Sequence, residues 1–152
     1  MNPQPIAWSN RVLRWLHGAA HVLDLGIRLY VAEIFFRSGL LKIGNWNGTL
    51  YLFKNEYRVP LLPPEAAAWL GTFGELFFPP LLALGLAARF AALSLSVVNV
   101  MAVISFWHVL GGNEAALMSH VYWGILLLVT LCHGPGKISL DHWIHRRWFA
   151  ER

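Results

Sequence analysis

Four apolar segments recur along the chain, with a longer loop between the first and the second and a tight connection between the second and the third. They cover residues 23–43, 65–87, 89–110 and 115–133. Each is close to the twenty residues that a helix needs to cross a bilayer. The pattern therefore predicts an all-α protein in which residues 23–134 form a four-helix transmembrane bundle.

The two ends of the chain show a different pattern, in which tryptophan and other apolar residues recur at helical spacing beside arginines. These stripes consist of Trp8, Val12, Trp15, Leu16 and Ala19 at the first end, and of Leu140, Trp143, Ile144 and Trp148 at the other. Tryptophan and arginine favour the headgroup region of a membrane. We therefore predict amphipathic interfacial helices within residues 1–22 and 135–152.

Composition agrees with a membrane protein. Hydrophobic residues make up 57% of the chain and its mean hydropathy is +0.49, which is more than a soluble domain needs for its core. The net charge is +4, but the lysines and arginines flank the apolar segments, so they do not form a nucleic-acid surface. The single cysteine, Cys132, excludes an internal disulfide.

The basic residues also predict an orientation. An even number of spans places both termini on one side, and that side holds Arg11, Arg14, Arg89, Lys137, Arg146, Arg147 and Arg152. The opposite loops hold only Lys54 and Arg58. By the positive-inside rule, both termini are expected in the cytoplasm.

Some ionisable residues fall inside the apolar segments. Asp24, Arg28 and Lys42 lie toward the ends of the first segment, where their charges are expected to reach the headgroups. Glu33 and Arg37 are harder to place, because they lie near its middle, where a charge costs on the order of 3 kcal/mol. Being four residues apart, they are expected to pair and to face the bundle interior.

The second segment adds Glu75 at a similar depth, followed by Pro79 and Pro80. Each proline deprives the carbonyl four residues earlier of its helical partner, so a kink is expected beside Glu75. Asn99 of the third segment lies at the same level as these groups. Glu33, Arg37, Glu75 and Asn99 are therefore expected to meet.

Two interpretations of this polar group remain open. It is either a clamp that fixes how the helices pack or a functional pocket, in which Glu75 and Glu33 handle protons and Arg37 sets their charge. Two acids that share one arginine beside a proline kink exceed what packing requires. We therefore favour the pocket, with Arg37, Glu75 and Asn99 as its ligand-binding groups.

Two histidines suggest a metal site. His108 and His120 end one apolar segment and begin the next, and the short loop between them can bring them together. With Met101, Glu114 or Met118 they could bind copper, and two facing histidines could ligate a haem. The alternative is that both are interfacial residues bonded to nearby carbonyl or carboxylate groups.

Several of these residues lie in motifs that resemble the DoxX family. The similarity runs from residue 23 to residue 141 and includes Arg28, the run Gly39-Leu-Leu-Lys42, Glu75, the run Gly85-Leu-Ala-Ala-Arg89 and the run Gly134-Pro-Gly-Lys-Ile-Ser-Leu-Asp141. His120 with Trp123-Gly124 resembles a subgroup encoded beside enzymes that modify copper-binding peptides. Glu33 and Arg37 depart from the family pattern, in which these positions are often small or apolar.

The resemblance implies a small bacterial inner-membrane protein associated with redox chemistry. Some relatives are subunits of a thiosulfate:quinone oxidoreductase, so one hypothesis is an oxidoreductase subunit that binds a quinone or a similar small molecule. A second is a non-enzymatic accessory or passage in periplasmic copper or peptide handling, and a third is a purely structural subunit. The expected partners are the lipid bilayer, membrane or periplasmic proteins and a second copy of the chain.

Overall fold

The computed structural model describes residues 5–148, with side chains described for residues 13–16 and 18–148. The described chain is helical and contains no strand. Its helices are α1 (Pro5–Gly44), α2 (Trp46–Asn55), α3 (Pro64–Leu84), α4 (Ala88–Ser105), α5 (Trp107–Leu110), α6 (Glu114–His133) and α7 (Leu140–Trp148). The predicted all-α class is confirmed.

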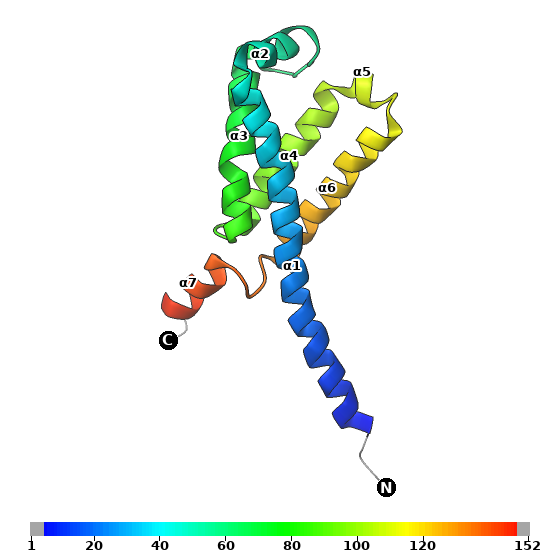
Figure 1. Ribbon diagram of the computed structural model, residues 1–152, viewed down its shortest axis with the longest axis vertical. Helices are drawn as coiled ribbons and strands as arrows, with labels where there is room; N and C mark the ends of the chain where they lie inside the picture. The colour runs from blue at the N-terminus through cyan, green and yellow to red at the C-terminus, as the bar shows by residue number, and fades with distance from the viewer. Residues whose placement is uncertain (1–4, 149–152) are drawn as a thin grey trace.

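The long helices form one bundle (Figure 1). The upper part of α1 packs mainly on α3, α3 packs on α4, α4 packs on α6, and α6 returns to α1. Helices α2 and α5 lie at one end, which we call the α2 end, whereas α7 and the α3–α4 turn lie at the other, the α7 end (Figure 1). Both chain ends extend from the α7 end, as an even number of crossings requires.

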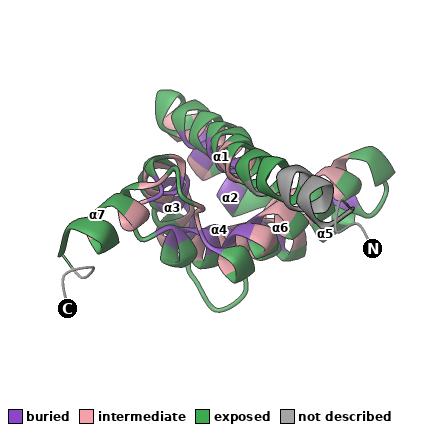
Figure 2. Ribbon diagram, turned by 90° about the horizontal axis from the view of Figure 1, so that it is seen from below, coloured by how far each residue is buried: buried purple, intermediate pink, exposed green. Residues whose placement is uncertain are grey.

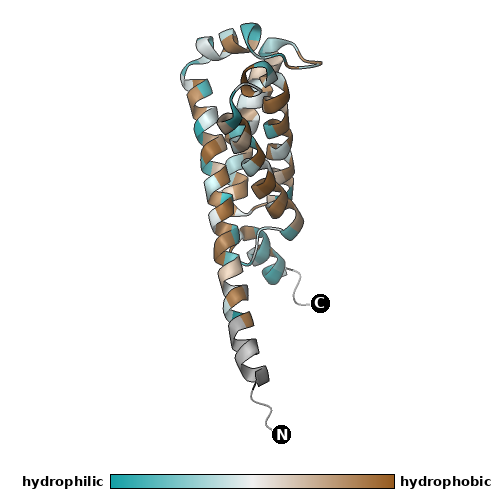
Figure 3. Cartoon of the chain, turned by 90° about the vertical axis from the view of Figure 1, so that its right-hand side faces the viewer, coloured by the Kyte–Doolittle hydropathy of each residue, from teal (hydrophilic) through white to brown (hydrophobic). Residues whose placement is uncertain are grey.

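Helices α3, α4 and α6 are each long and apolar enough to cross a membrane. Helix α1 is long enough as well, but its apolar part carries five charged residues, which are Asp24, Arg28, Glu33, Arg37 and Lys42. It nevertheless runs beside the other three along the bundle (Figure 3). The chain is therefore a multi-pass membrane protein with an apolar exterior.

The predicted boundary between residues 22 and 23 does not coincide with a break in secondary structure. Helix α1 continues from Pro5 to Gly44, because this stretch contains no proline after its first residue and Gly18 and Gly26 do not interrupt it. Its first half projects beyond the bundle (Figure 1). Among the predicted stripe residues, the side chains of Trp8 and Val12 lie outside the described set, and interfacial placement of both chain ends stays a prediction.

The bundle core is built from aliphatic side chains, one phenylalanine and several alanines. Its buried members are Val31, Ala32, Phe35, Leu82, Ala91, Ala92, Leu95 and Leu127. Alanine side chains are small, so they allow α4 to pack closely against its neighbours. Buried positions follow the inner side of each long helix, whereas the outer sides are exposed (Figure 2).

The α2 end is more ordered than the sequence suggested. Instead of a long loop, residues 46–55 form α2, whose start is capped by the Asn45 side chain accepting from the Gly48 N–H at 3.1 Å. Phe53 of α2 packs with Ala67 and Ala68 of α3 in a second small core. The third apolar segment is also divided, because α4 ends at Ser105.

Candidate functional site

A cavity of about 240 Å³ lies near the α2 end, between α3, α4 and the segment that joins α2 to α3. Its lining is mostly aliphatic and aromatic, and its polar members are Lys42, Tyr57, Glu75 and Ser105. Leu70 of α3 and Val97 of α4 also line it, although both are exposed on the outer side of the bundle. The cavity therefore opens sideways between α3 and α4, toward the lipid.

The polar end of the cavity is an ion pair between α1 and α3. Lys42 Nζ lies 2.5 Å from Glu75 Oε2 and also donates to Ser38 Oγ at 2.9 Å. The Glu75 side chain is only 9% exposed and that of Lys42 only 19%. Both charges are thus largely withdrawn from the exterior and neutralise one another at the end of an apolar space.

A glycine and two prolines allow this contact between α1 and α3. A Cβ atom at Gly39 would lie 3.1 Å from the Glu75 carbonyl carbon and 2.8 Å from Leu76 Cγ, so only glycine permits the two helices to approach so closely. Pro79 and Pro80 remain inside α3 and remove the helical partners of the carbonyls of residues 75 and 76. Glu75 therefore lies where α3 approaches α1 closely and where two of its helical hydrogen bonds are missing.

Tyr57 lines the cavity from the segment after α2. Its ring packs on Phe53 and Phe106, with centroid separations of 4.7 and 4.9 Å. Burial raises the pKa of the Tyr57 phenol above its ordinary value of 10.0, and the negative charge of Glu75 raises it further. The phenol is therefore a hydrogen-bond donor at neutral pH.

The predicted pair of Glu33 and Arg37 forms, with Arg37 Nη2 2.6 Å from Glu33 Oε1, but it does not face the bundle interior. Their side chains are 57% and 75% exposed, respectively. The spacing of four residues fixed their common face, but the side of α1 that packs on the bundle carries Val31, Ala32 and Phe35. Lys42, rather than Arg37, is the cation that contacts Glu75.

Asn99 is buried but bonds to a histidine instead of the acids. Its Nδ2 donates to the His120 carbonyl at 2.9 Å, and its Oδ1 lies 2.8 Å from His120 Nδ1. His120 also packs on the Trp123 ring at 4.8 Å between centroids. Asn99 thus joins α4 to α6, and the predicted meeting of Glu33, Arg37, Glu75 and Asn99 is wrong.

The two histidines proposed as metal ligands have different neighbours. His108 Nε2 lies 3.9 Å from Glu56 Oε2 and its ring packs on Phe106, whereas His120 is held by Asn99. Among the side chains that the structure describes, no three or more His, Cys, Asp and Glu residues are grouped so that they could hold a metal ion. Copper or haem binding stays a prediction.

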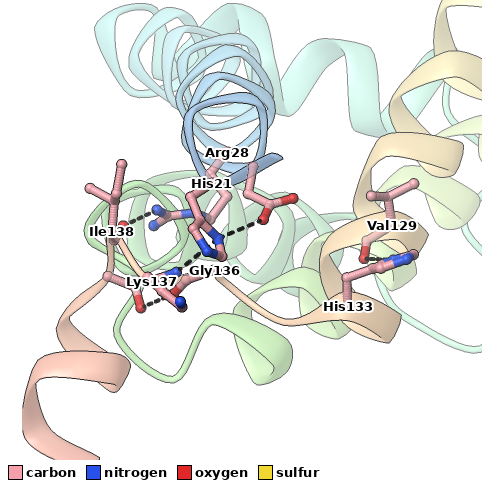
Figure 4. Close-up of polar contacts among 9 residues, drawn as sticks. His21, Arg28, Val129, His133, Gly136, Lys137 and Ile138 are labelled. Atoms are coloured by element: carbon pink, nitrogen blue, oxygen red, sulfur yellow. Dashed lines mark hydrogen bonds and ion pairs between the residues drawn. The ribbon is translucent and has the colours of Figure 1, made fainter. Parts of the chain in front are cut away.

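Arg28 has a role that the sequence interpretation missed. It was expected to reach the headgroups, but it is 1% exposed and points into the α7 end (Figure 4). Its Nη1 donates to the carbonyls of Leu82 and Ala83, at 3.2 and 3.0 Å, and its Nη2 donates to the Ile138 carbonyl. It thereby satisfies the Ala83 carbonyl at the end of α3, shares the Leu82 carbonyl with the Gly85 N–H, and joins α1 to the segment before α7.

The same end contains a cap that comes from a distant part of the chain. Asp141 of α7 accepts hydrogen bonds from the N–H groups of Ala87 and Ala88, at 2.8 and 3.0 Å. Arg89 adds a longer contact to the Cys132 carbonyl at 3.4 Å. Family resemblance was the available signal, since the motif residues Arg28, Lys42, Glu75, Arg89 and Asp141 all make contacts between distant segments.

Comparison with known proteins agrees with the resemblance to the DoxX family. The DoxX family model matches residues 23–108. An uncharacterized protein of Haemophilus influenzae is 33% identical over 121 residues, which cover 76% of this chain and 78% of that protein. No solved structure gives a significant match. On these grounds the chain belongs to the DoxX family of membrane proteins.

Proposed function

We propose that this protein binds an amphipathic membrane molecule, a quinone or a similar compound, in the cavity between α3 and α4. The observation that carries the proposal is an apolar cavity that opens toward lipid and ends on the buried ion pair of Lys42 and Glu75. Apolar pockets with a few convergent polar groups are typical ligand sites. The lateral opening suits a ligand that enters from the bilayer.

The size of the cavity indicates which part of such a ligand it would hold. At about 240 Å³ it is smaller than the roughly 300–1,000 Å³ of pockets that enclose a whole ligand. It therefore suits a ring-shaped head group whose apolar tail remains in the lipid between Leu70 and Val97. The aromatic rings of Phe53 and Tyr57 are placed to pack on such a ring.

The polar side chains supply complementary chemistry. Lys42 and Tyr57 carry hydrogen-bond donors for a carbonyl oxygen, and Glu75 is the acid that can accept or return a proton at the same place. A quinone supplies electron-accepting chemistry when bound, and the family resemblance supports a role in a redox-associated complex. Glu33 and Arg37 lie outside the cavity and are not part of this proposal.

The direct test is to identify and measure the bound molecule. Lipid extracts of gently purified protein are analysed by mass spectrometry, and a short-chain ubiquinone is titrated while tryptophan fluorescence is recorded. We expect a co-purifying quinone and saturable quenching, with affinity reduced several-fold in Glu75→Gln and Lys42→Met.

Glu33→Gln is the matched control, because it neutralises an acid of the same bundle that lies outside the cavity. Quenching that does not saturate, or affinities equal in Glu75→Gln and the unaltered protein, would contradict the proposal.

One observation favours a second candidate, a passage for a small molecule in periplasmic copper or peptide handling. A further hollow of about 440 Å³, lined by α1 and α2, shares Lys42, Phe53 and Tyr57 with the cavity, so these side chains separate two spaces. His108 and His120 line neither space, so copper handling is tested separately, by the copper content of the purified protein against that of the double variant His108→Ala and His120→Ala. Equal, negligible copper in both argues against copper handling.

A further inference from the structure

The exposed side of α1 presents a continuous stripe with heptad spacing. Leu29, Phe36 and Ile43 follow one another at intervals of seven residues. A second series, Gly26, Glu33 and Leu40, has the same interval and lies three residues before the first. All six positions are exposed, with Leu29 at 50%, Leu40 at 48% and Ile43 at 53%. Spacings of three and four residues that average 3.5 are the pattern of two helices that pack along a shared seam.

The stripe continues into the half of α1 that projects beyond the bundle. Trp15, Ala19 and Val22 extend the same spacing and are exposed, Trp15 at 76% and Val22 at 63%. The whole helix is about 60 Å long at 1.5 Å per residue, roughly twice the hydrocarbon thickness of a bilayer. A long helix with one apolar side that nothing covers is suited to pairing with another helix.

The charges on this stripe restrict the partner. Glu33 and Arg37 are exposed about ten and fourteen residues beyond Leu23, at a depth where contact with lipid is costly even for a paired charge. A covering surface must therefore offer both an acid and a base at that depth. The described chain has such a surface in the same side of α1, so a second copy is complementary to it.

We propose that two copies associate through α1, packed in parallel along this stripe with Glu33 and Arg37 at the centre. Identical membrane chains insert in the same direction, so the twofold axis is perpendicular to the membrane and equal depths meet. Arg37 lies about 6 Å beyond Glu33 along the axis, within reach of the acid of either copy. The four charges alternate in sign, and a polar group at one seam position fixes the register of the pair.

Cysteine cross-linking in native membranes tests the seam. In a Cys132→Ser background, Phe36→Cys places a thiol on the stripe, whereas Leu41→Cys places one on the same helix but beside the stripe. Leu41 is 77% exposed, so accessibility alone does not favour Phe36. Oxidation should give a product of twice the chain mass with Phe36→Cys and little product with Leu41→Cys.

Charge variants of Phe36→Cys test the centre of the seam. Glu33→Arg puts four positive charges together and should abolish the cross-link, whereas adding Arg37→Glu restores alternating charges and the cross-link. Gel filtration and thermal unfolding show whether each variant is folded.

Several outcomes would overturn the proposal. These are equal cross-linking at residues 36 and 41, absence of the doubled mass, an adduct with a different protein, or failure of the charge exchange to restore the product while the double variant is folded.

Discussion

Arg28 shows how a single charged residue can stabilise a membrane bundle from within. Its guanidinium reaches carbonyls of three residues in two segments, Leu82 and Ala83 in α3 and Ile138 before α7. Arginine presents donors in a planar fork, so one side chain can serve several carbonyls. The nearby Gly85 is required as well, because a Cβ atom there would collide with Arg28 and Ser139.

We expect Arg28→Met to be strongly destabilising. The partly buried carbonyls of Ala83 and Ile138 would lose their donor, and a fully buried acceptor left unpaired costs about 1–3 kcal/mol, which is the upper bound for each. Arg28→Lys should recover part of the loss, since an ammonium keeps the charge but not the fork. Thermal unfolding in mild detergent measures this, with Arg14→Met on the exposed part of α1 as control. Equal unfolding temperatures for Arg28→Met and Arg14→Met would refute the role.

Tyr57 gives a prediction about pH. Burial and the negative charge of Glu75 raise the pKa of the Tyr57 phenol, so it should ionise only at a pH above its ordinary pKa of 10.0. In the unfolded chain the phenol ionises near pH 10.0, below the pH at which it ionises in the folded protein. The folded state therefore loses stability as the pH rises above 10.0, and Tyr57→Phe should remove this loss. Near-ultraviolet titration should show the latest tyrosinate absent in Tyr57→Phe but present in Tyr51→Phe, which removes an exposed ring. Identical curves for the two variants would contradict the assignment.

At the scale of elements, α4 depends on a residue more than fifty positions away. Its N-cap, Ala87, has no capping side chain and a left-handed backbone with φ of 46°, so Asp141 of α7 supplies the cap. A carboxylate at a helix start also meets the positive end of the helix dipole. The cap therefore links the α3–α4 turn to the C-terminal helix.

Replacing this cap should loosen the α7 end without altering the cavity. Asp141→Ala is expected to cost about 0.5–2 kcal/mol, the usual value of a cap, and Asp141→Asn less, since one acceptor remains. Limited proteolysis should then cut between α6 and α7 more rapidly, whereas quinone quenching should be unchanged. Glu114→Gln, which alters an exposed acid in the first turn of α6, is the control. Proteolysis at the same rate in Asp141→Ala and the control would be inconsistent with this role.

The sequence predicted elements better than side-chain directions. Hydropathy located α3 and α6 to within a few residues and the α3–α4 turn correctly, because lipid requires long apolar helices. It also placed Glu33 and Arg37 on one face, but that face could not be assigned to the interior or exterior without knowing where α3 packs. Gly39 decides this packing through contact with Glu75, which neither periodicity nor charge reveals.

At the scale of the molecule, α1 has two sides with separate proposed roles. Lys42 faces α3 and the cavity, whereas Glu33 and Arg37 lie on the exposed side, where the second copy would pack. The two sides share a helix but no described hydrogen bond or ion pair. Mutations at two sites without shared partners usually change the free energy by amounts that add.

We therefore predict that ligand binding and association can be lost separately. Glu75→Gln should weaken quinone quenching but leave the Phe36→Cys cross-link intact, because Glu75 is enclosed between α1 and α3. Glu33→Arg should abolish the cross-link but leave quenching unchanged in the resulting monomer. The variant with both changes should show both defects, each as large as alone. If Glu33→Arg also weakened quenching while thermal unfolding remained normal, the cavity would require the second copy, and the two sides of α1 would act as one site.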